Sequence, residues 1–474
     1  MTASPLQGHG RSKEELVATA NKPHQVISWG LWDAGNSSFH ALVVTFVFAV
    51  YLVNAVGENI TGPFAASTWL AWSMAIGGLI IAVLAPVTGQ RSDAAGRRKR
   101  ALGFLTVLTI ICMFGMFFVR NSDTPFTFNL GFTEFTVQHY YFWLGLILLA
   151  LAAAFSELSN VPYNAMLRQV SRPETVGKVS GLAWSFGYFG GIFLLLFSFF
   201  GFMAGDGDTR GFLGLSTDEG FNVRLVVVMA AIWFAILAVP LFLTIPELPR
   251  DPRADHRATL RQSYAKVFRD VKTLYREDRR TVLYLLAQGI FRDGLSGVFA
   301  FGAILAVTVY GITESDVLLF GAAANIVAGL GALSAGFFDD KFGPKAVIVT
   351  GLVAMIATGV VLLIAEGPMM FWVFGLILTF WVGPIQSAAR TFMVRLTPPG
   401  REGEMFGLYL MVGRAVSFLT PALFGLFVWI FAGDRFGIIG IILVLSAGLA
   451  LVLAVKKPDQ LGVGMRATPL APRD

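Results

Sequence analysis

The sequence predicts an all-α membrane protein with twelve transmembrane helices in two pseudo-symmetric six-helix halves. The 474 residues are 55% hydrophobic and only 14% charged, with a mean hydropathy of +0.68, whereas soluble domains carry about 25% charged residues. Twelve apolar stretches reach the length of about 20 residues that a bilayer span requires. A charged turn also occurs twice, half a chain apart, which indicates a bundle built from two repeats.

The twelve apolar stretches define the predicted spans and the parts of the chain between them. They cover residues 27–56, 64–88, 101–119, 139–165, 178–203, 222–245, 282–310, 315–337, 345–365, 370–395, 404–431 and 436–455. Residues 1–26 are polar and lack the apolar core of a signal peptide, so the first stretch is expected to remain as a span. We therefore predict an N-terminal tail 1–26, an N-terminal half 27–245, a connector 246–281, a C-terminal half 282–456 and a C-terminal tail 457–474.

Basic residues are concentrated on one side of the predicted spans. Alternate connections and the two tails hold 30 of the 36 Lys and Arg residues. Because Lys and Arg gather in cytoplasmic loops, both termini are predicted to be cytoplasmic. The same bias explains the net charge of +6 without a nucleic-acid partner. A single cysteine, Cys112, excludes an intrachain disulfide.

The connector 246–281 holds ten basic residues and a second pattern. Its apolar residues recur at helical spacing, at Leu260, Tyr264, Val267, Phe268, Val271 and Leu274. A basic amphipathic helix on the inner leaflet is expected. Binding to a protein partner is the alternative.

The repeated turn is the clearest link between the halves. Gly89, Asp93 and Gly96 in the first copy correspond to Gly336, Asp340 and Gly343 in the second, and basic residues follow each copy. Further matches recur in the same order and support two similar halves. They are Asp33 with Asp293, Tyr51 with Tyr310, Pro162 with Pro384, Asn164 with Gln386, and Gly181 and Gly187 with Gly407 and Gly413.

Twelve helices in two halves are typical of one family of membrane proteins, and so is the charged turn that follows the second helix, Gly89-Gln-Arg-Ser-Asp93-Ala-Ala-Gly96-Arg97-Arg98-Lys99-Arg100. Over about residues 27–456 the chain resembles the major facilitator superfamily. The segments 29–39, 160–167, 179–191, 383–390 and 398–409 are similar to its vacuole-effluxer-like branch. The fungal member of that branch is linked to export of amino acids from the vacuole. The resemblance implies a transporter, not an enzyme, that works without a cofactor or metal ion. A monomer in a bacterial inner membrane is expected.

By this resemblance the charged turns act as a conformational latch at the cytoplasmic side. Asp93 would cap a helix of the opposite half while the arginines pair with carboxylates, and a carboxylate at a helix N-terminus contributes about 0.3–1 kcal/mol. The alternative is a solvated turn that only satisfies the positive-inside rule. The expected latch residues are Gly89, Asp93, Gly96, Arg97, Arg98, Asp340 and Gly343.

Ionisable residues inside the spans are few, and such residues usually face the bundle interior or a cavity. They are Asp33, His40, Glu157, Arg292, Asp293 and Arg414. We hypothesise that Asp33 and Glu157 carry protons or cations, and that Arg292 or Arg414 binds a substrate carboxylate. The alternative is that Arg292–Asp293 and Glu157–Arg414 are ion pairs that hold helices in register. His40 is interpreted as a hydrogen-bonded packing residue.

Neutral polar residues in the spans are the remaining binding candidates. Asn36, Asn164, Gln386 and Asn325 would bind polar ends of a substrate or bridge neighbouring helices. The favoured function is cation-coupled export of amino acids or similar small polar metabolites. A sugar–cation symporter and a non-transporting scaffold or sensor are the alternatives. The chain lacks a P-loop motif and a His-Glu-x-x-His metal motif.

Overall fold

The computed structural model describes residues 22–60, 63–122, 125–130, 133–248 and 260–455. Within these residues twelve helical segments are long and apolar enough to cross a membrane, which confirms the twelve predicted spans. The predicted tail 457–474, residues 1–21 of the other tail and residues 249–259 of the connector lie outside the described residues.

The first six spans are built from seven α-helices and short π-helical segments. The helices are α2 (Pro23–Phe39), α3 (Phe48–Tyr51), α4 (Ala66–Ala95), α5 (Arg98–Met116), α6 (Tyr140–Ala165), α8 (Val176–Ser198) and α9 (Phe221–Thr244), and a short α7 (Leu167–Val170) follows α6. Two antiparallel hairpins connect spans: β1 (Phe126–Leu130) with β2 (Thr133–Val137), and β3 (Thr209–Arg210) with β4 (Leu215–Ser216).

The connector and the last six spans follow the same plan. Helix α10 (Leu260–Glu277) leads into α11 (Arg279–Thr308), α12 (Glu314–Phe342), α13 (Pro344–Ile364), α14 (Pro368–Leu396), α15 (Glu402–Val416), α16 (Leu419–Phe431) and α17 (Gly437–Ala454).

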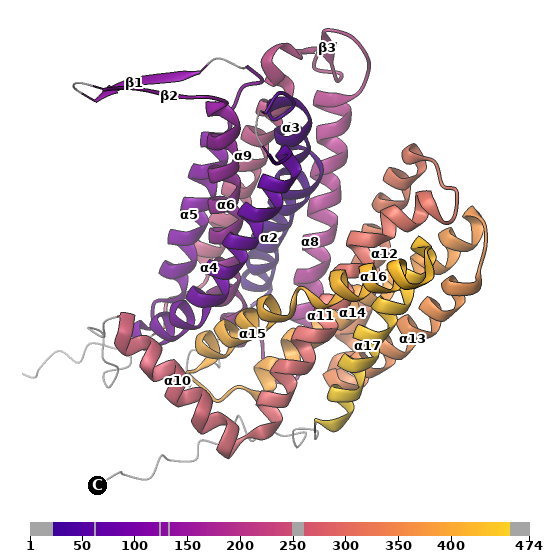
Figure 1. Ribbon diagram of the computed structural model, residues 1–474. Helices are drawn as coiled ribbons and strands as arrows, with labels where there is room; N and C mark the ends of the chain where they lie inside the picture. Colours follow the sequence, from indigo (N-terminus) through magenta and orange to yellow (C-terminus); the bar gives the residue numbers. More distant parts are fainter. Residues whose placement is uncertain (1–21, 61–62, 123–124, 131–132, 249–259, 456–474) are drawn as a thin grey trace, which may run out of the picture.

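Figure 1 shows α2 to α9 in one group and α11 to α17 in another, with α10 between them at one end of the molecule. We call this end, which carries Arg98, Lys99 and α10, the basic end. Both hairpins lie at the opposite end (Figure 1). The exact limits of the two halves stay a prediction.

Large apolar side chains cover the outside of the bundle as well as its core. Leu243 and Trp429 are each 79% exposed, while Trp29 and Trp32 are fully buried. An apolar outer surface of this extent is unfavourable in water. In a bilayer it meets lipid, and the helices satisfy their own backbone polar groups, as a spanning segment must.

Several helices extend beyond the apolar stretches that predicted them. Helix α4 ends at Ala95 and α12 at Phe342, whereas residues 88 and 337 were expected. Gly96 then ends α4 with a left-handed φ of +61°, a conformation that glycine adopts without the cost of a Cβ. Gly89 and Asp93 therefore belong to the last turns of a helix, which corrects their prediction as loop residues.

The span predicted at 404–431 is two helices rather than one. Helix α15 ends at Val416 and α16 begins at Leu419. Pro421 has no backbone N–H to donate to the preceding turn, which favours a break here. The first span is also irregular, because residues 40–46 and 52–56 form π-helical turns. Composition gave no sign of these turns.

Helix α10 confirms the helix predicted in the connector, but its apolar residues do not all lie where they were expected. Val267 and Leu274 are buried, and Tyr264 Oη donates to the Val83 carbonyl of α4 at 2.9 Å. Phe268 and Tyr275 are exposed instead, at 75% and 55%. The helix is therefore fastened to the N-terminal half, and its contact with the inner leaflet stays a prediction.

Candidate functional site

A cavity of about 260 Å³ is lined by α11, α15 and α16 of the C-terminal half and by one residue of α6 in the N-terminal half. Four of the predicted binding candidates line it: Glu157, Arg292, Asp293 and Arg414. The structure thus brings together residues that are more than 250 positions apart in the chain.

Glu157 and Arg414 form an ion pair across this cavity. Arg414 Nη2 lies 2.7 Å from Glu157 Oε1, which joins α6 to α15. The second oxygen, Glu157 Oε2, is buried and has no hydrogen-bond partner among the described residues. A buried acceptor without a partner is costly, so this oxygen is available to a ligand.

Asp293 and Arg292 are adjacent in the chain but do not pair with each other in the part of the chain that the structure describes. Asp293 Oδ2 instead accepts a hydrogen bond from the Thr420 backbone N–H at 2.6 Å, so it caps the first turn of α16. Arg292 lies 5.8 Å from the ring centroid of Tyr409 and lines the cavity. The proposed Arg292–Asp293 pair is therefore wrong, and Arg292 offers a cation to the cavity.

Asn36 joins a chain of polar groups beside the cavity. Ser156 Oγ donates to Asn36 Oδ1 at 2.6 Å and lies 3.0 Å from His40 Nε2. His40 begins the π-helical turn of the first span, and such turns are frequent at functional sites. Ser156 was missed by the sequence analysis, although it directly precedes Glu157.

A second buried cluster surrounds Arg390 of α14. Arg390 donates to Ser180 Oγ at 3.0 Å, to the Ser180 carbonyl at 2.8 Å and to Asn164 Oδ1 at 3.3 Å. Arg390 is only 4% exposed on a helix that continues to Leu396, although the sequence analysis did not select it among the charges inside the spans. Asp33 is buried near this cluster, and Arg390 is the cation whose field acts on it.

Two polar candidates belong to neither cluster. Gln386 is half-buried on α14, and no contact among the described residues ties it to the cavity or to Arg390. Asn325 Nδ2 donates to the Gly321 carbonyl within its own helix at 2.8 Å.

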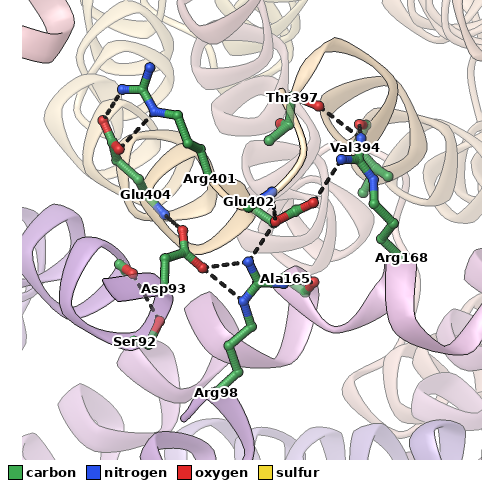
Figure 2. A network of polar contacts seen from close by, with 12 residues as sticks. Ser92, Asp93, Arg98, Ala165, Arg168, Val394, Thr397, Arg401, Glu402 and Glu404 are labelled. Atoms are coloured by element: carbon green, nitrogen blue, oxygen red, sulfur yellow. Dashed lines mark hydrogen bonds and ion pairs between the residues drawn. The ribbon is translucent and has the colours of Figure 1, made fainter. Parts of the chain in front are cut away.

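The first charged turn lies in a network of buried ions at the basic end (Figure 2). Asp93 Oδ2 accepts from the Glu404 backbone N–H of the opposite half at 2.9 Å. Arg98 Nη2 lies 2.5 Å from both Asp93 Oδ1 and Glu402 Oε2. Arg168 Nη1 reaches Glu402 Oε1 at 2.7 Å. Glu402, in the C-terminal half, therefore binds two arginines of the N-terminal half.

The second charged turn makes the corresponding backbone contact. Asp340 accepts from the Gly177 N–H at 2.8 Å and the Lys178 N–H at 3.1 Å, at the start of α8 in the opposite half. Arg395 Nη2 lies 3.1 Å from Asp339 Oδ1, and Thr391 Oγ1 donates to the same carboxylate. Both of these partners belong to the C-terminal half.

Glycines allow the helices to approach at both contacts. A Cβ on Gly89 would overlap the Gly403 carbonyl, and a Cβ on Gly336 would lie 2.8 Å from Lys178 Cα. The remaining predicted latch residues border these contacts. Arg97 donates its backbone N–H to the Ser92 carbonyl at 3.2 Å, and Gly343, with φ of +86°, separates α12 from α13.

Glu402, Arg168 and Arg390 are charged residues of these contacts that the sequence analysis did not select. Glu402 and Arg390 lie in the segments that carried the family resemblance. Their pairing depends on where helices of the two halves meet, which spacing along the chain does not reveal.

The family model described as "Vacuole effluxer Atg22 like" matches residues 62–460. The chain belongs to the Atg22-like family. This Atg22-like protein is 21% identical over 444 residues to the Bacillus subtilis protein named "Uncharacterized MFS-type transporter YxiO", covering 94% of this chain and 97% of the relative. It is 24% identical over 240 residues to "Autophagy-related protein 22-1" of Aspergillus fumigatus, covering 46% of this chain but only 39% of that protein.

Solved structures show the same fold. The Atg22-like protein superimposes on the proton:xylose symporter XylE, bound to 6-bromo-6-deoxy-D-glucose, with a TM-score of 0.68 over 96% of this chain and 98% of XylE. The match to FucP in its outward conformation has a TM-score of 0.63 over 92% and 98% of the two chains. Identity is 14% in both cases, so these matches give the fold alone. The protein is an integral, multi-pass MFS transporter, and not an enzyme.

Proposed function

We propose that this Atg22-like protein exports amino acids or similar small polar metabolites by alternating access, coupled to a proton or another cation. The observation that carries the proposal is the presence of two opposite charges, Glu157 and Arg292, at one cavity. Glu157 Oε2 has no hydrogen-bond partner among the described residues, and Arg292 lines the same cavity. A zwitterion presents an ammonium to the first and a carboxylate to the second.

The position of the cavity supports alternating access. Its walls belong to the C-terminal half except for Glu157, and the Glu157–Arg414 ion pair joins the two halves there. Substrate sites of secondary transporters lie at such repeat interfaces, beside interrupted helices. The break between α15 and α16 and the π-helical turn at His40 both border this region.

The contacts at the basic end support a latch. Asp93 and Asp340 each cap a helix of the opposite half, so opening this end must break both. By the positive-inside rule this end faces the cytoplasm, of a bacterial inner membrane in our proposal. The described conformation is then closed to the cytoplasm.

Coupling is assigned to Asp33 and Glu157. Glu157 forms an ion pair with Arg414 of the other half at 2.7 Å, and the charge of Arg390, also of the other half, acts on Asp33. Adding a proton or exchanging a cation at either carboxylate weakens its attraction to that arginine. Cation binding and the closure of the two halves are thereby linked.

The test is counterflow of radiolabelled amino acids, organic acids and sugars in proteoliposomes, with and without a proton or sodium gradient. We expect amino acids to exchange, and Glu157→Gln and Arg292→Gln to lower exchange by about tenfold or more, as for loss of a charged contact of 1.5–3 kcal/mol. Glu366→Gln is the control, because this glutamate side chain is 84% exposed. Exchange of sugars alone would replace the proposal by the symporter alternative, and no exchange of any solute would favour a scaffold.

Closure of the basic end has its own measurement. Spin labels at Glu174 and Pro399, exposed residues on either side of this end, report the distance between the halves in a Cys112→Ala background. We call this the Glu174–Pro399 label pair. Two populations whose ratio changes with substrate are expected. A single fixed distance would contradict alternating access.

A further inference from the structure

Three aromatic side chains of the N-terminal half enclose the guanidinium of Arg390. Arg390 Cζ lies 4.7 Å from the ring centroid of Trp29, 5.5 Å from Trp184 and 5.9 Å from Tyr163. A cation within about 6 Å of a ring centroid is attracted by the ring, most strongly by Trp. We call Trp29, Tyr163 and Trp184 the aromatic cage. Arg390 enters it from α14, so the cage and its occupant belong to different halves.

Contacts inside the N-terminal half hold much of the cage in place. The rings of Trp29 and Tyr163 stack at 4.6 Å. Trp29 Nε1 donates to the Tyr163 carbonyl at 3.2 Å, and Tyr163 Oη donates to the Trp29 carbonyl at 3.1 Å. Trp32 stacks on Tyr163 at 4.4 Å and is itself bonded to Thr106. None of these contacts involves Arg390, so its departure leaves these two walls intact.

The negative charge of Asp33 near the aromatic cage favours binding of a cation there. Asp33 lies one helical turn after Trp29, is 8% exposed and accepts no hydrogen bond from any residue that the structure describes. Arg390 is the cation that acts on it. Without Arg390, the buried Asp33 carboxylate would lose the counter-charge that acts on it, which is strongly unfavourable.

Alternating access, the proposed function on which this inference rests, draws α14 away from the N-terminal half when the basic end opens. We propose that the aromatic cage with Asp33 is a binding site for organic cations, which Arg390 fills in the closed conformation. When the basic end opens, the guanidinium of a solute takes the place of Arg390. The site is matched to guanidinium, because the cage already holds that group with hydrogen-bond acceptors at Ser180 and Asn164.

The first experiment empties the cage by mutation. Arg390→Ala should shift the Glu174–Pro399 label pair toward the open distance, and millimolar methylguanidinium should stabilise the purified variant against heat. Sodium chloride at equal ionic strength should not. Trp29→Leu in the Arg390→Ala background should weaken the methylguanidinium response by about tenfold, as expected for a desolvated cation–π contact. Arg395→Ala, which removes a cation outside the cage, should show no such response.

The second experiment leaves Arg390 in place and opens the basic end. Glu402→Gln breaks the cross-half ion pairs, and arginine should then bind to this variant while citrulline, its uncharged isostere, should not. Asp33→Asn added to Glu402→Gln should weaken arginine binding by about tenfold or more, as for loss of a charged hydrogen-bonding partner. This experiment still tests the cage if Arg390→Ala fails to fold.

The outcomes separate this inference from the proposed function. Equal binding of arginine and citrulline, or no stabilisation of Arg390→Ala by methylguanidinium, overturns the cation site. If a lower pH alone restores the thermal stability of Arg390→Ala, the cation site is also overturned, because a proton on Asp33 would then replace the missing cation. Failure of Glu402→Gln to change the label distance instead counts against alternating access.

Discussion

Asp93 and Asp340 each accept hydrogen bonds from the first turn of a helix in the opposite half, but their ionic surroundings differ. At Asp93, Arg98 and Arg168 both bind Glu402 across the boundary between the halves. At Asp340, the neighbouring Arg395 binds carboxylates of its own half. The backbone cap is thus common to both copies of the repeated turn, while ion pairs that cross the boundary strengthen only the first.

The exposure of the charges sharpens this difference. At the first contact the side chains of Arg98, Asp93 and Glu402 are 4–8% exposed and that of Arg168 is 17% exposed. At the second contact Asp339 and Asp340 are equally buried, at 1% and 8%, and only their partner Arg395 is more exposed, at 26%. Buried ion pairs are strongly destabilised when one partner is removed, while exposed ones matter little. The contact at Asp93 should therefore control the opening of the basic end, and the contact at Asp340 should break only after it.

The largest effect is expected from Glu402→Gln. This change leaves Arg98 and Arg168 buried with less negative charge, and removing one partner of a buried pair costs about 3–5 kcal/mol. The Glu174–Pro399 label pair should move to the open distance. Arg395→Gln is the matched change at the second contact and should shift the distance far less. Equal shifts would contradict the asymmetry.

Gly89→Ala and Gly336→Ala should both open the basic end, by similar amounts. Each added Cβ meets backbone of the opposite half, and forced overpacking costs about 1–3 kcal/mol. Gly78→Ala is the control, because a Cβ there meets nothing within 4 Å. The label pair reports both changes. A large effect of Gly89→Ala alone would show that close helix packing, like the ion pairs, matters only at the first contact.

Asp93→Asn and Asp340→Asn compare the two caps directly. Asn keeps one acceptor oxygen, so Asp340→Asn loses the charge–dipole part of the cap, about 0.3–1 kcal/mol. It also loses one of the two hydrogen bonds from the Gly177 and Lys178 N–H groups and the 3.7 Å contact with Arg395. Asp93→Asn also loses the charge that Arg98 binds, and hydrogen bonds to charged groups are worth about 1.5–3 kcal/mol. Transport rates and label distances should change more for Asp93→Asn. The reverse order would reject the ion network as the stronger element.

Two lysines that bind the C-terminal carbonyls of the last helix of each half are expected to have smaller effects on stability, of similar size in the two halves. Lys99 Nζ donates to the Phe242 and Ile245 carbonyls at the C-terminal end of α9, and Lys345 Nζ donates to the Leu453 and Val455 carbonyls at the C-terminal end of α17. Lys99→Met and Lys345→Met should each lower thermal stability by a similar amount, about 0.3–1 kcal/mol, without changing the label distance. A change in distance would mean that these lysines also hold the halves together.

The smallest effect concerns Glu247, which accepts the Lys99 backbone N–H at 2.9 Å. Partial burial raises the pKa of this carboxyl, against the lowering effect of its bonds to Lys99 and Arg100. A raised pKa means that the folded state binds the proton more tightly, so this contribution to stability is present in acid and is lost as pH rises through the raised pKa. Glu247→Gln should flatten that pH dependence in thermal unfolding. An unchanged profile would exclude Glu247 as its source.

Much of the fold was predictable because bilayer chemistry acts on the sequence locally. Each span must be apolar over a fixed length, and the twelve spans follow from that rule alone. The ends of helices were less predictable. Asp93 and Asp339 lie in turns that are polar yet helical, because helix formation continues past the lipid boundary when a cap or a packing partner exists.

The candidate site was predictable in kind but not in arrangement. Charges in spans selected Glu157, Arg292, Asp293 and Arg414, and the structure places all four around one cavity. Arg390 was not selected, since it lies near the end of its apolar stretch. The pairing of Arg292 with Asp293 was wrong for a related reason, since adjacent residues on a helix point in different directions.

The sequence by itself determined the membrane class, the number of spans, the repeat and the family, since each of these depends on composition, length or spacing along the chain. Only the tertiary structure decided which charges meet. Glu402 binds Arg98 and Arg168, and Arg390 enters the aromatic cage, because helices from different halves cross at glycines. Such contacts join residues more than 200 positions apart, and their geometry depends on how whole helices pack rather than on any local pattern.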